Sequence, residues 1–189
     1  MTIAEHNRAV SGAGSVNLNA KNVEFLIQQL TVLVVDDNAF MRNIVRGLLG
    51  NIGVKKTYEA SDGIAGLEMI REVAPDIVVL DWEMPMLSGL DLVRIVRSPG
   101  VFPTPDIPII MLSAHGERWR VVEAVKLGVN EFLCKPVSAK SLQERLVSIL
   151  IKPRESVRLG EYYGPAPRSP MLRPNLDGAA PVPAAADAV

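Results

Sequence analysis

Short apolar runs alternate along the chain with longer segments in which apolar residues recur every three or four positions. The short runs are rich in β-branched residues, as is typical of buried strands in a parallel sheet, and lie at about 31–35, 54–60, 76–80, 109–112 and 131–134. A segment with helical spacing follows each run, at about 39–49, 63–74, 89–97, 117–127 and 139–150. Five consecutive strand–helix units predict an α/β fold, a (βα)5 doubly wound sandwich.

The five strand–helix units cover residues 31–152. The segments before and after them differ in composition and in hydrophobic periodicity. Residues 1–20 are polar and small and predict a flexible extension. Residues 21–30 predict a short helix, either docked on the domain or free to bind a partner. Seven of the 14 prolines lie in residues 153–189, which lack any period. We expect a disordered, dispensable tail there, with a docking peptide around residues 162–165 as the alternative.

Composition narrows the class of protein. Hydrophobic residues make up 48% of the chain, enough for a real core, and the net charge of −1 gives no general attraction to nucleic acid or anionic lipid. One cysteine excludes an internal disulfide and a cysteine-based zinc cluster, and it fits a reducing compartment. No apolar stretch approaches the roughly 18–20 residues of a membrane-spanning helix, and no secretory signal is visible. We expect a cytoplasmic protein that neither enters a membrane nor binds nucleic acid.

Four of the expected strands end at polar residues. Asp36 and Asp37 follow the first strand, Asp81 the third, Ser113 the fourth and Lys135 the fifth. Each alone would pass as a cap, a turn residue or a solvated charge. The carboxyl ends of parallel strands share one edge of a sheet, however, and functional groups gather there. Three carboxylates, a hydroxyl and an ammonium at one edge favour a divalent metal and a phosphoryl group, since Mg²⁺ prefers oxygen ligands and an aspartate can form an acyl phosphate.

These residues belong to a longer set of motifs whose order is specific. The set comprises Val34-Val35-Asp36-Asp37-Asn38, Asp81-Trp82-Glu83-Met84-Pro85, Leu87-Ser88-Gly89, Ser113-Ala114 and Lys135-Pro136. Over about residues 31–151 the chain resembles two-component response-regulator receiver domains, most closely the single-domain, CheY-like members. The resemblance implies a flavodoxin-like fold with a five-stranded parallel sheet in the order 2-1-3-4-5.

The resemblance also implies roles for the residues at the sheet edge. Asp81 would be the phosphoacceptor. Asp37 and Asp81 would bind Mg²⁺ directly, and Asp36 would bind it through water. The backbone carbonyl of Glu83 would complete the protein ligands, and Lys135 would contact the phosphoryl group. Two neighbouring residues bear on the lifetime of that group: Glu83 could add negative charge, and His115 could hydrogen-bond water or crowd it, and the sequence leaves these alternatives open.

The same resemblance implies a pair of residues that change conformation on phosphorylation. The residue types of a neighbouring helix predict a surface that binds a partner. Ser113 and Phe132 would be the switch pair, although Phe132 lacks the hydroxyl with which a tyrosine could hold either ring position. The helix at 117–127 starts beside Phe132 and combines a tryptophan with arginines, which are enriched at interface hot spots. We expect a partner surface formed by Arg118, Trp119, Val121 and Val125. The alternative is that Trp119 folds back over its own helix.

Three functions compete. The first is a stand-alone response regulator that accepts a phosphoryl group from a sensor histidine kinase or histidine phosphotransfer protein and signals to a downstream protein. It would be no enzyme beyond its own phosphoryl transfer and slow autodephosphorylation. The second is a phosphatase of the haloacid-dehalogenase type, disfavoured because Asp36-Asp37-Asn38-Ala39 lacks a second aspartate two positions after the first and no cap domain is evident. The third, a phosphorylation-independent adaptor, is disfavoured because every required site group is present.

Overall fold

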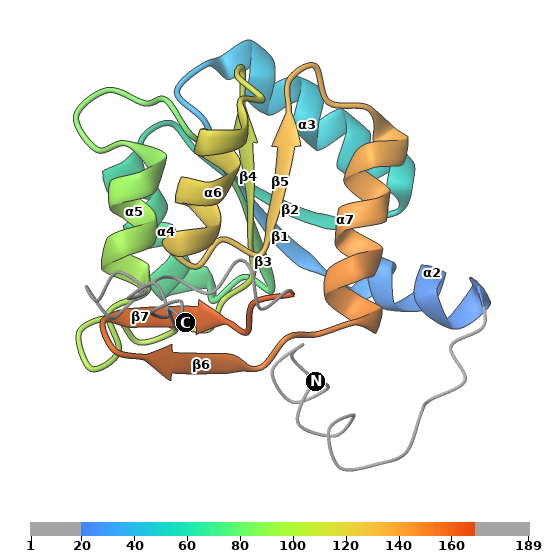
Figure 1. Cartoon of the computed structure of the whole chain (residues 1–189). Coiled ribbons are helices and arrows are strands. Elements are labelled where there is room, and N and C mark those ends of the chain that lie inside the picture. Colours follow the sequence, from blue (N-terminus) through green and yellow to red (C-terminus); the bar gives the residue numbers. More distant parts are fainter. Residues whose placement is uncertain (1–19, 169–189) are drawn as a thin grey trace, which may run out of the picture.

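The computed structural model describes residues 20–168 of the chain (Figure 1). The main sheet contains β1 (Thr31–Val35), β2 (Lys56–Ala60), β3 (Ile77–Asp81), β4 (Ile109–Ser113) and β5 (Glu131–Cys134). The helices are α2 (Ala20–Gln29), α3 (Ala39–Ile52), α4 (Gly63–Val73), α5 (Gly89–Val96), α6 (Arg118–Lys126) and α7 (Ala139–Ile151). Two further strands follow α7: β6 (Ser156–Leu159) and β7 (Tyr162–Pro165). Within this described part, no helix has the length and apolar character needed to cross a membrane.

The strands of the main sheet are all parallel and follow the order β2-β1-β3-β4-β5. This order confirms the predicted flavodoxin-like α/β fold. Helices α3 and α7, with α2 at one end, cover one face of the sheet, and α4, α5 and α6 cover the other (Figure 1). A separate apolar core fills the space on each face.

Local sequence explains where the elements lie and where they begin. Strands β1, β3 and β4 are buried along almost their whole length, as expected for central strands of a parallel sheet, whereas the edge strand β2 is exposed at alternate residues. The side chain of Asn38 accepts hydrogen bonds from the backbone N–H groups of Phe40 and Met41 and starts α3. Ser138 and Ser141 form a capping box that starts α7. Each cap fixes the turn that follows a strand, and therefore the direction of the side chains at the sheet edge.

The helix expected at residues 21–30 is α2, and it docks on the domain. Ile27 and Leu30 are 1% exposed and join the core beneath α3 and α7. Of the flexible extension expected over residues 1–20, residues 1–19 lie outside the described part of the chain.

The segment after α7 differs from the sequence-based prediction. The sequence predicts a disordered tail over 153–189, but β6 and β7 pair as an antiparallel hairpin over residues 156–165. The hairpin lies across the end of the sheet opposite the carboxyl ends of β4 and β5 (Figure 1). The prediction is therefore wrong for this stretch, while residues 169–189 lie outside the described residues.

Tertiary contacts hold the hairpin in place. Tyr162 is buried, and the hydroxyl of Tyr163 donates to Asp106 Oδ1 at 2.6 Å. The backbones of Gly164 and Gly128 meet so closely that a Cβ on Gly164 would lie 2.8 Å from the Cα of Gly128. The segment considered as a docking peptide thus packs on its own domain. A segment rich in proline and glycine has weak strand preference of its own, so these contacts left no periodic signal in the sequence.

Candidate functional site

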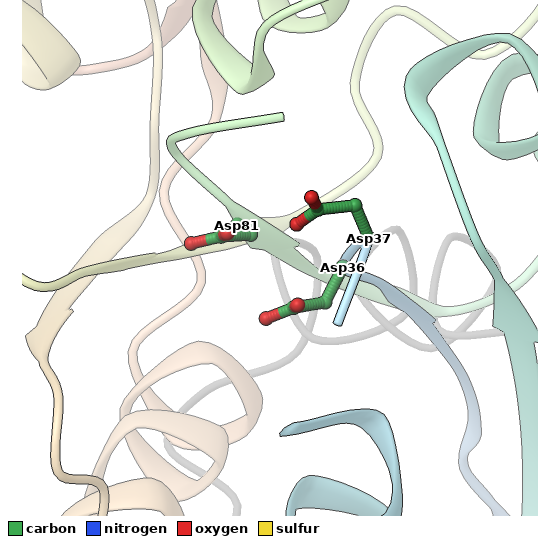
Figure 2. Close-up of side chains that lie close together, drawn as sticks. All are labelled: Asp36, Asp37 and Asp81. Carbon is green, nitrogen blue, oxygen red and sulfur yellow. The ribbon is translucent and has the colours of Figure 1, made fainter. Parts of the chain in front are cut away.

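Three carboxylates meet at the carboxyl edge of the sheet. Asp36 and Asp37 follow β1, and Asp81 is the last residue of β3 (Figure 2). One oxygen atom from each carboxylate lies within 4.8 Å of the others. Asp36 and Asp81 are buried, at 1% and 6% exposed, whereas Asp37 is exposed. The cluster can therefore be reached from solvent on the side of Asp37.

Lys135 brings a positive charge into this cluster. Its Nζ lies 2.9 Å from Asp36 Oδ2 and 2.9 Å from Asp81 Oδ1. Its backbone N–H donates to the carbonyl of Ser113 at 2.7 Å, which fixes the residue after β5 against the end of β4. Burial alone would lower the pKa of Lys135, but hydrogen bonds and charges from Asp81 and Asp36 outweigh burial and raise that pKa above its ordinary value. Lys135 is therefore a cation at neutral pH.

The charge balance of the cluster fits a divalent cation. Burial raises the pKa of the Asp81 carboxyl, and the negative charge of Asp36 raises it further, although the hydrogen bond from Lys135 acts in the opposite direction. Among the described residues, this cluster thus combines three carboxylates with one ammonium, which contacts two of them. Carboxylate oxygens are the ligands that Mg²⁺ prefers. The residues present therefore fit the magnesium ion that the sequence predicts.

Backbone contacts hold the first acidic pair rigidly. Asp36 Oδ1 accepts the backbone N–H of Asn38 at 2.9 Å, which closes the turn from β1 to α3. Arg42 Nη1 donates to the backbone carbonyl of Asp36 at 2.8 Å, and Arg42 Nε lies 3.3 Å from Glu59 Oε2. Glu59 on β2 thus orients Arg42, and Arg42 in turn holds the backbone of Asp36 after β1. The acidic pair is therefore fixed in position before any ligand binds.

The loop after Asp81 depends on a glycine. A Cβ on Gly89 would lie 2.1 Å from the carbonyl oxygen of Asp81, a distance that no side chain tolerates. The N–H of Gly89 donates to the carbonyl of Trp82 at 3.0 Å, and Ser88 caps α5 by accepting the N–H of Asp91. The serine–glycine pair of the sequence motif therefore lets α5 start directly against the strand end that carries Asp81.

Ser113 and Phe132, the predicted switch pair, lie on neighbouring strands beside the carboxylates. Ser113 ends β4 directly after Leu112, the register partner of Asp81, and it is 1% exposed. Its Oγ accepts the backbone N–H of His115 at 3.1 Å. The half-buried ring of Phe132 meets Trp82 edge to face, with ring centroids 6.2 Å apart. The hydroxyl on β4 and the ring on β5 thus border the end of β3 and the residue that follows it.

The side chain of Glu83 has partners that sequence reasoning missed. Its Oε1 lies 2.9 Å from Nη1 of Arg120 and 3.9 Å from Nε2 of His115. Glu83 and Arg120 are 37 positions apart, and no local pattern links them. A carboxylate two residues after Asp81 is therefore paired with a cation from α6.

The predicted partner surface lies on α6. Arg118 and Trp119 are exposed, while Val121 and Val125 are half-buried. The ring of Trp119 contacts the guanidinium of Arg120 on its own helix, yet the residue is still 58% exposed. An open groove on the outer side of α6 is lined by Arg118, Trp119, Val122, Glu123 and Lys126.

A doubly wound parallel sheet with an acidic cluster and a lysine at its carboxyl edge is the arrangement of a receiver domain. Residues 32–147 match the family of response regulator receiver domains, and the chain belongs to that family. The matched range ends before the hairpin, so β6 and β7 are additions to the receiver fold in this chain.

Individual relatives agree with this assignment. The chain is 37% identical over 124 residues to the chemotaxis protein CheY-3 of Vibrio cholerae, an alignment that covers 66% of this chain and 94% of that protein. It is 37% identical over 120 residues to the chemotaxis protein CheY of Pseudomonas aeruginosa, covering 64% and 95%. The solved receiver domain of the Francisella response regulator 1452 matches with a TM-score of 0.58 at 33% identity, covering 66% and 98%. The chain is thus a CheY-like receiver of two-component signalling.

Proposed function

We propose that this chain is a response regulator of a two-component phosphorelay that accepts a phosphoryl group on Asp81 in the presence of Mg²⁺. The observation that carries the proposal is the contact of Lys135 with both Asp36 and Asp81, beside Asp37, at one edge of the sheet. This arrangement combines a nucleophile, a cation for the incoming group and oxygen ligands for a metal. Membership of the receiver family supports the same reading.

The resemblance to receiver domains implies the metal ligands. Asp37, Asp81 and the backbone carbonyl of Glu83 would hold Mg²⁺ directly, and Asp36 would hold it through water. The ion would screen the negative charge of the phosphoryl oxygens, which three carboxylates would otherwise repel. The exposure of Asp37 leaves a path from solvent for the ion and for the donor.

Phosphoryl transfer then uses the residues around the strand ends. A carboxylate oxygen of Asp81 attacks the phosphorus atom of a phosphohistidine; the new O–P bond forms as the N–P bond breaks, and the imidazole leaves. Lys135 pairs with one phosphoryl oxygen as a point charge. The hydroxyl of Ser113 donates a hydrogen bond to another. The product is a phosphoaspartate held between β3, β4 and β5.

Switching couples this site to a surface on α6, β5 and α7. Ser113 moves toward the phosphoryl group and leaves space behind it, into which the ring of Phe132 turns. A coupling of about 1–3 kcal/mol is typical of such elements, so both forms coexist before phosphorylation. The surface that changes comprises Arg118, Trp119, Val121 and Val125.

The donor would be a sensor histidine kinase or a histidine phosphotransfer protein, and the recipient of the signal would be a protein that binds the α6 surface. The expected cytoplasmic location belongs to the same proposal. The protein would catalyse its own phosphorylation and slow dephosphorylation, without turning over other substrates.

Labelling tests the proposal. With Mg²⁺ and acetyl phosphate, the parent protein should acquire one base-labile phosphoryl group, and Asp81→Asn should acquire none. Asp91→Asn is the matched control, because Asp91 lies on α5 and pairs with Ser88 and Arg94 away from the cluster, so it should be labelled like the parent. Equal labelling of Asp81→Asn would refute the acceptor assignment. Repeated turnover of a small phosphate ester would instead indicate a phosphatase.

A further inference from the structure

Arg120 lies between the two tryptophans of the chain. Its guanidinium carbon is 5.2 Å from the ring centroid of Trp82 and 5.0 Å from that of Trp119. Contacts of this kind are attractive, and more so where water is excluded; the Arg120 side chain is only 16% exposed. Its Nη1 also lies 2.9 Å from Glu83 Oε1. Within α6 and its N-cap, Glu117 Oε2 lies 3.6 Å from Arg120 Nε. Two rings and two carboxylates therefore hold this one guanidinium, and only Trp82 and Glu83 of these four groups lie outside the α6 segment.

These contacts join two elements that phosphorylation would affect differently. Trp82 and Glu83 directly follow Asp81, and backbone hydrogen bonds tie Trp82 to both β4 and α5. Arg120 and Trp119 belong to the first turn of α6. The guanidinium is thus a bridge from the acceptor strand to the predicted partner surface.

The start of α6 is weakly anchored. Among the described residues, Glu117 at its N-cap forms no side-chain capping hydrogen bond, and residues 114–118 are all exposed. The loop before α6 is tied to β4 by the hydrogen bond from the N–H of His115 to Ser113 Oγ. Movement of Ser113 toward a phosphoryl group therefore pulls on this loop and on the first turn of α6. Glu83, meanwhile, stays with the acceptor strand.

We propose that Arg120 is a positioning residue that latches α6 to Glu83 in the unphosphorylated protein and releases it when Asp81 carries a phosphoryl group. The inference rests on the proposed function. Release changes the exposed side of α6, because the ring of Trp119 packs against the same guanidinium. Glu83 then acts through its side chain as the acceptor half of the latch.

The latch is strong enough to bias α6 and weak enough to open. Glu83 is 56% exposed, and ion pairs with such access to water contribute little. Loss of the latch should therefore shift the equilibrium between the two positions of α6 by about two- to fivefold, without abolishing the switch.

Fluorescence of the full chain tests the latch. Trp119→Phe leaves Trp82 as the sole tryptophan and keeps an aromatic ring beside Arg120. In this background, emission is measured with Mg²⁺ before and after acetyl phosphate is added, and the phosphoryl label is counted in the same samples. Arg120→Gln and Arg120→Lys alter the cation, whereas Glu83→Gln breaks the pair while the guanidinium stays beside the indole. Lys126→Gln, at an exposed cation in the last turn of the same helix, is the matched control.

The latch predicts a specific pattern. Arg120→Gln and Glu83→Gln should both shift the unphosphorylated emission toward the phosphorylated value and reduce the response about two- to fivefold. Their combination should do no more than either alone, since both break one contact. Arg120→Lys should restore part of the response, and Lys126→Gln should match its background. A full response in both glutamine variants, with normal labelling, overturns the latch alone; an unlabelled parent overturns the proposed function and the latch with it.

Discussion

Buried charge occurs at both ends of the central sheet, and the two ends compensate it in different ways. At the amino end Arg97 is 6% exposed, and its guanidinium donates to the carbonyls of Gly128, Pro105 and Ile107 and to the side chain of Asn130. At the carboxyl end the acidic cluster shares the ammonium of Lys135. Hydrogen-bond acceptors of the protein thus satisfy the charge of Arg97 completely. The single ammonium of Lys135 does not balance the negative charge of the three carboxylates.

This difference separates a structural charge from a functional one. Burial lowers the pKa of Arg97 to about 10, although the charges of Tyr162 and Asp106 act in the opposite direction, so Arg97 remains cationic at neutral pH. Neutral acceptors occupy each of its nitrogen atoms, which leaves no role for a ligand. The carboxylates keep an excess of negative charge beside solvent. Incomplete compensation, rather than burial itself, marks the edge at which we propose that a cation binds.

The largest expected effect is at the amino end. Arg97→Met should lower the free energy of unfolding by about 3–5 kcal/mol, because three backbone carbonyls and the Asn130 amide lose their buried donor. Urea unfolding measures this. Arg94→Met is the matched control, since Arg94 is exposed and pairs with Asp91 one turn earlier; its effect should stay below about 0.5 kcal/mol. A loss in Arg97→Met no larger than in this control would contradict the structural reading.

Removal of the hairpin should have the next largest effect. A chain ending at Lys152 loses the buried ring of Tyr162 and the hydrogen bonds of Arg154 to the carbonyls of Asn130 and Ala166. We expect its free energy of unfolding to fall by about 2–4 kcal/mol. Labelling of Asp81 should persist, because the hairpin lies at the opposite end of the sheet (Figure 1).

A single substitution in the hairpin tests its packing on the domain without shortening the chain. Tyr163→Phe removes the hydrogen bond to Asp106 Oδ1 and keeps the ring, so it should cost about 0.5–1.5 kcal/mol. A truncated chain as stable as the parent would restore the sequence-based view that residues after 152 are dispensable.

The two ends of the sheet also differ in how far the sequence predicts them. The acidic cluster was predictable because four of the five apolar runs end at a polar residue of this set, and parallel strands bring those ends together. Placement of Asp36, Asp81, Ser113 and Lys135 at one edge follows from that rule alone. The strand order and the roles of individual residues came from resemblance to a family.

The amino end offers no comparable signal. An arginine at the carboxyl end of a helix is usually exposed to solvent, where its charge interacts favourably with the helix dipole. No sequence pattern near Arg97 predicts that it is buried. Its acceptors are mainly backbone carbonyls, which every residue carries. The same limit applies to Arg120, because its contact with Glu83 joins the first turn of α6 to the loop after β3, which only the fold brings together. The surroundings of Arg97 and Arg120 depend on contacts between residues that are far apart in the sequence. The periodicity of hydrophobic residues does not predict such contacts.

A small effect of the opposite sign is expected at the carboxyl end. Burial and the charge of Asp36 raise the pKa of Asp81 above its value in the unfolded chain, 3.8. The folded state therefore holds the proton more tightly, and with Mg²⁺ removed by a chelator, stability should fall as pH rises from 3.8 through the higher folded pKa.

Asp81→Asn removes that ionisation and leaves Lys135 paired with Asp36, so at neutral pH without Mg²⁺ it should be more stable than the parent by roughly 1 kcal/mol. Added Mg²⁺ should stabilise the parent and narrow or reverse the difference, because the ion binds the folded carboxylates. Asp37→Asn is the control: the same change at an exposed carboxylate should raise Mg²⁺-free stability less. Thermal melts in chelator across pH measure all three proteins. If Asp81→Asn instead proves less stable than the parent without Mg²⁺, the cluster is compensated as fully as Arg97, and the contrast between the two ends of the sheet fails.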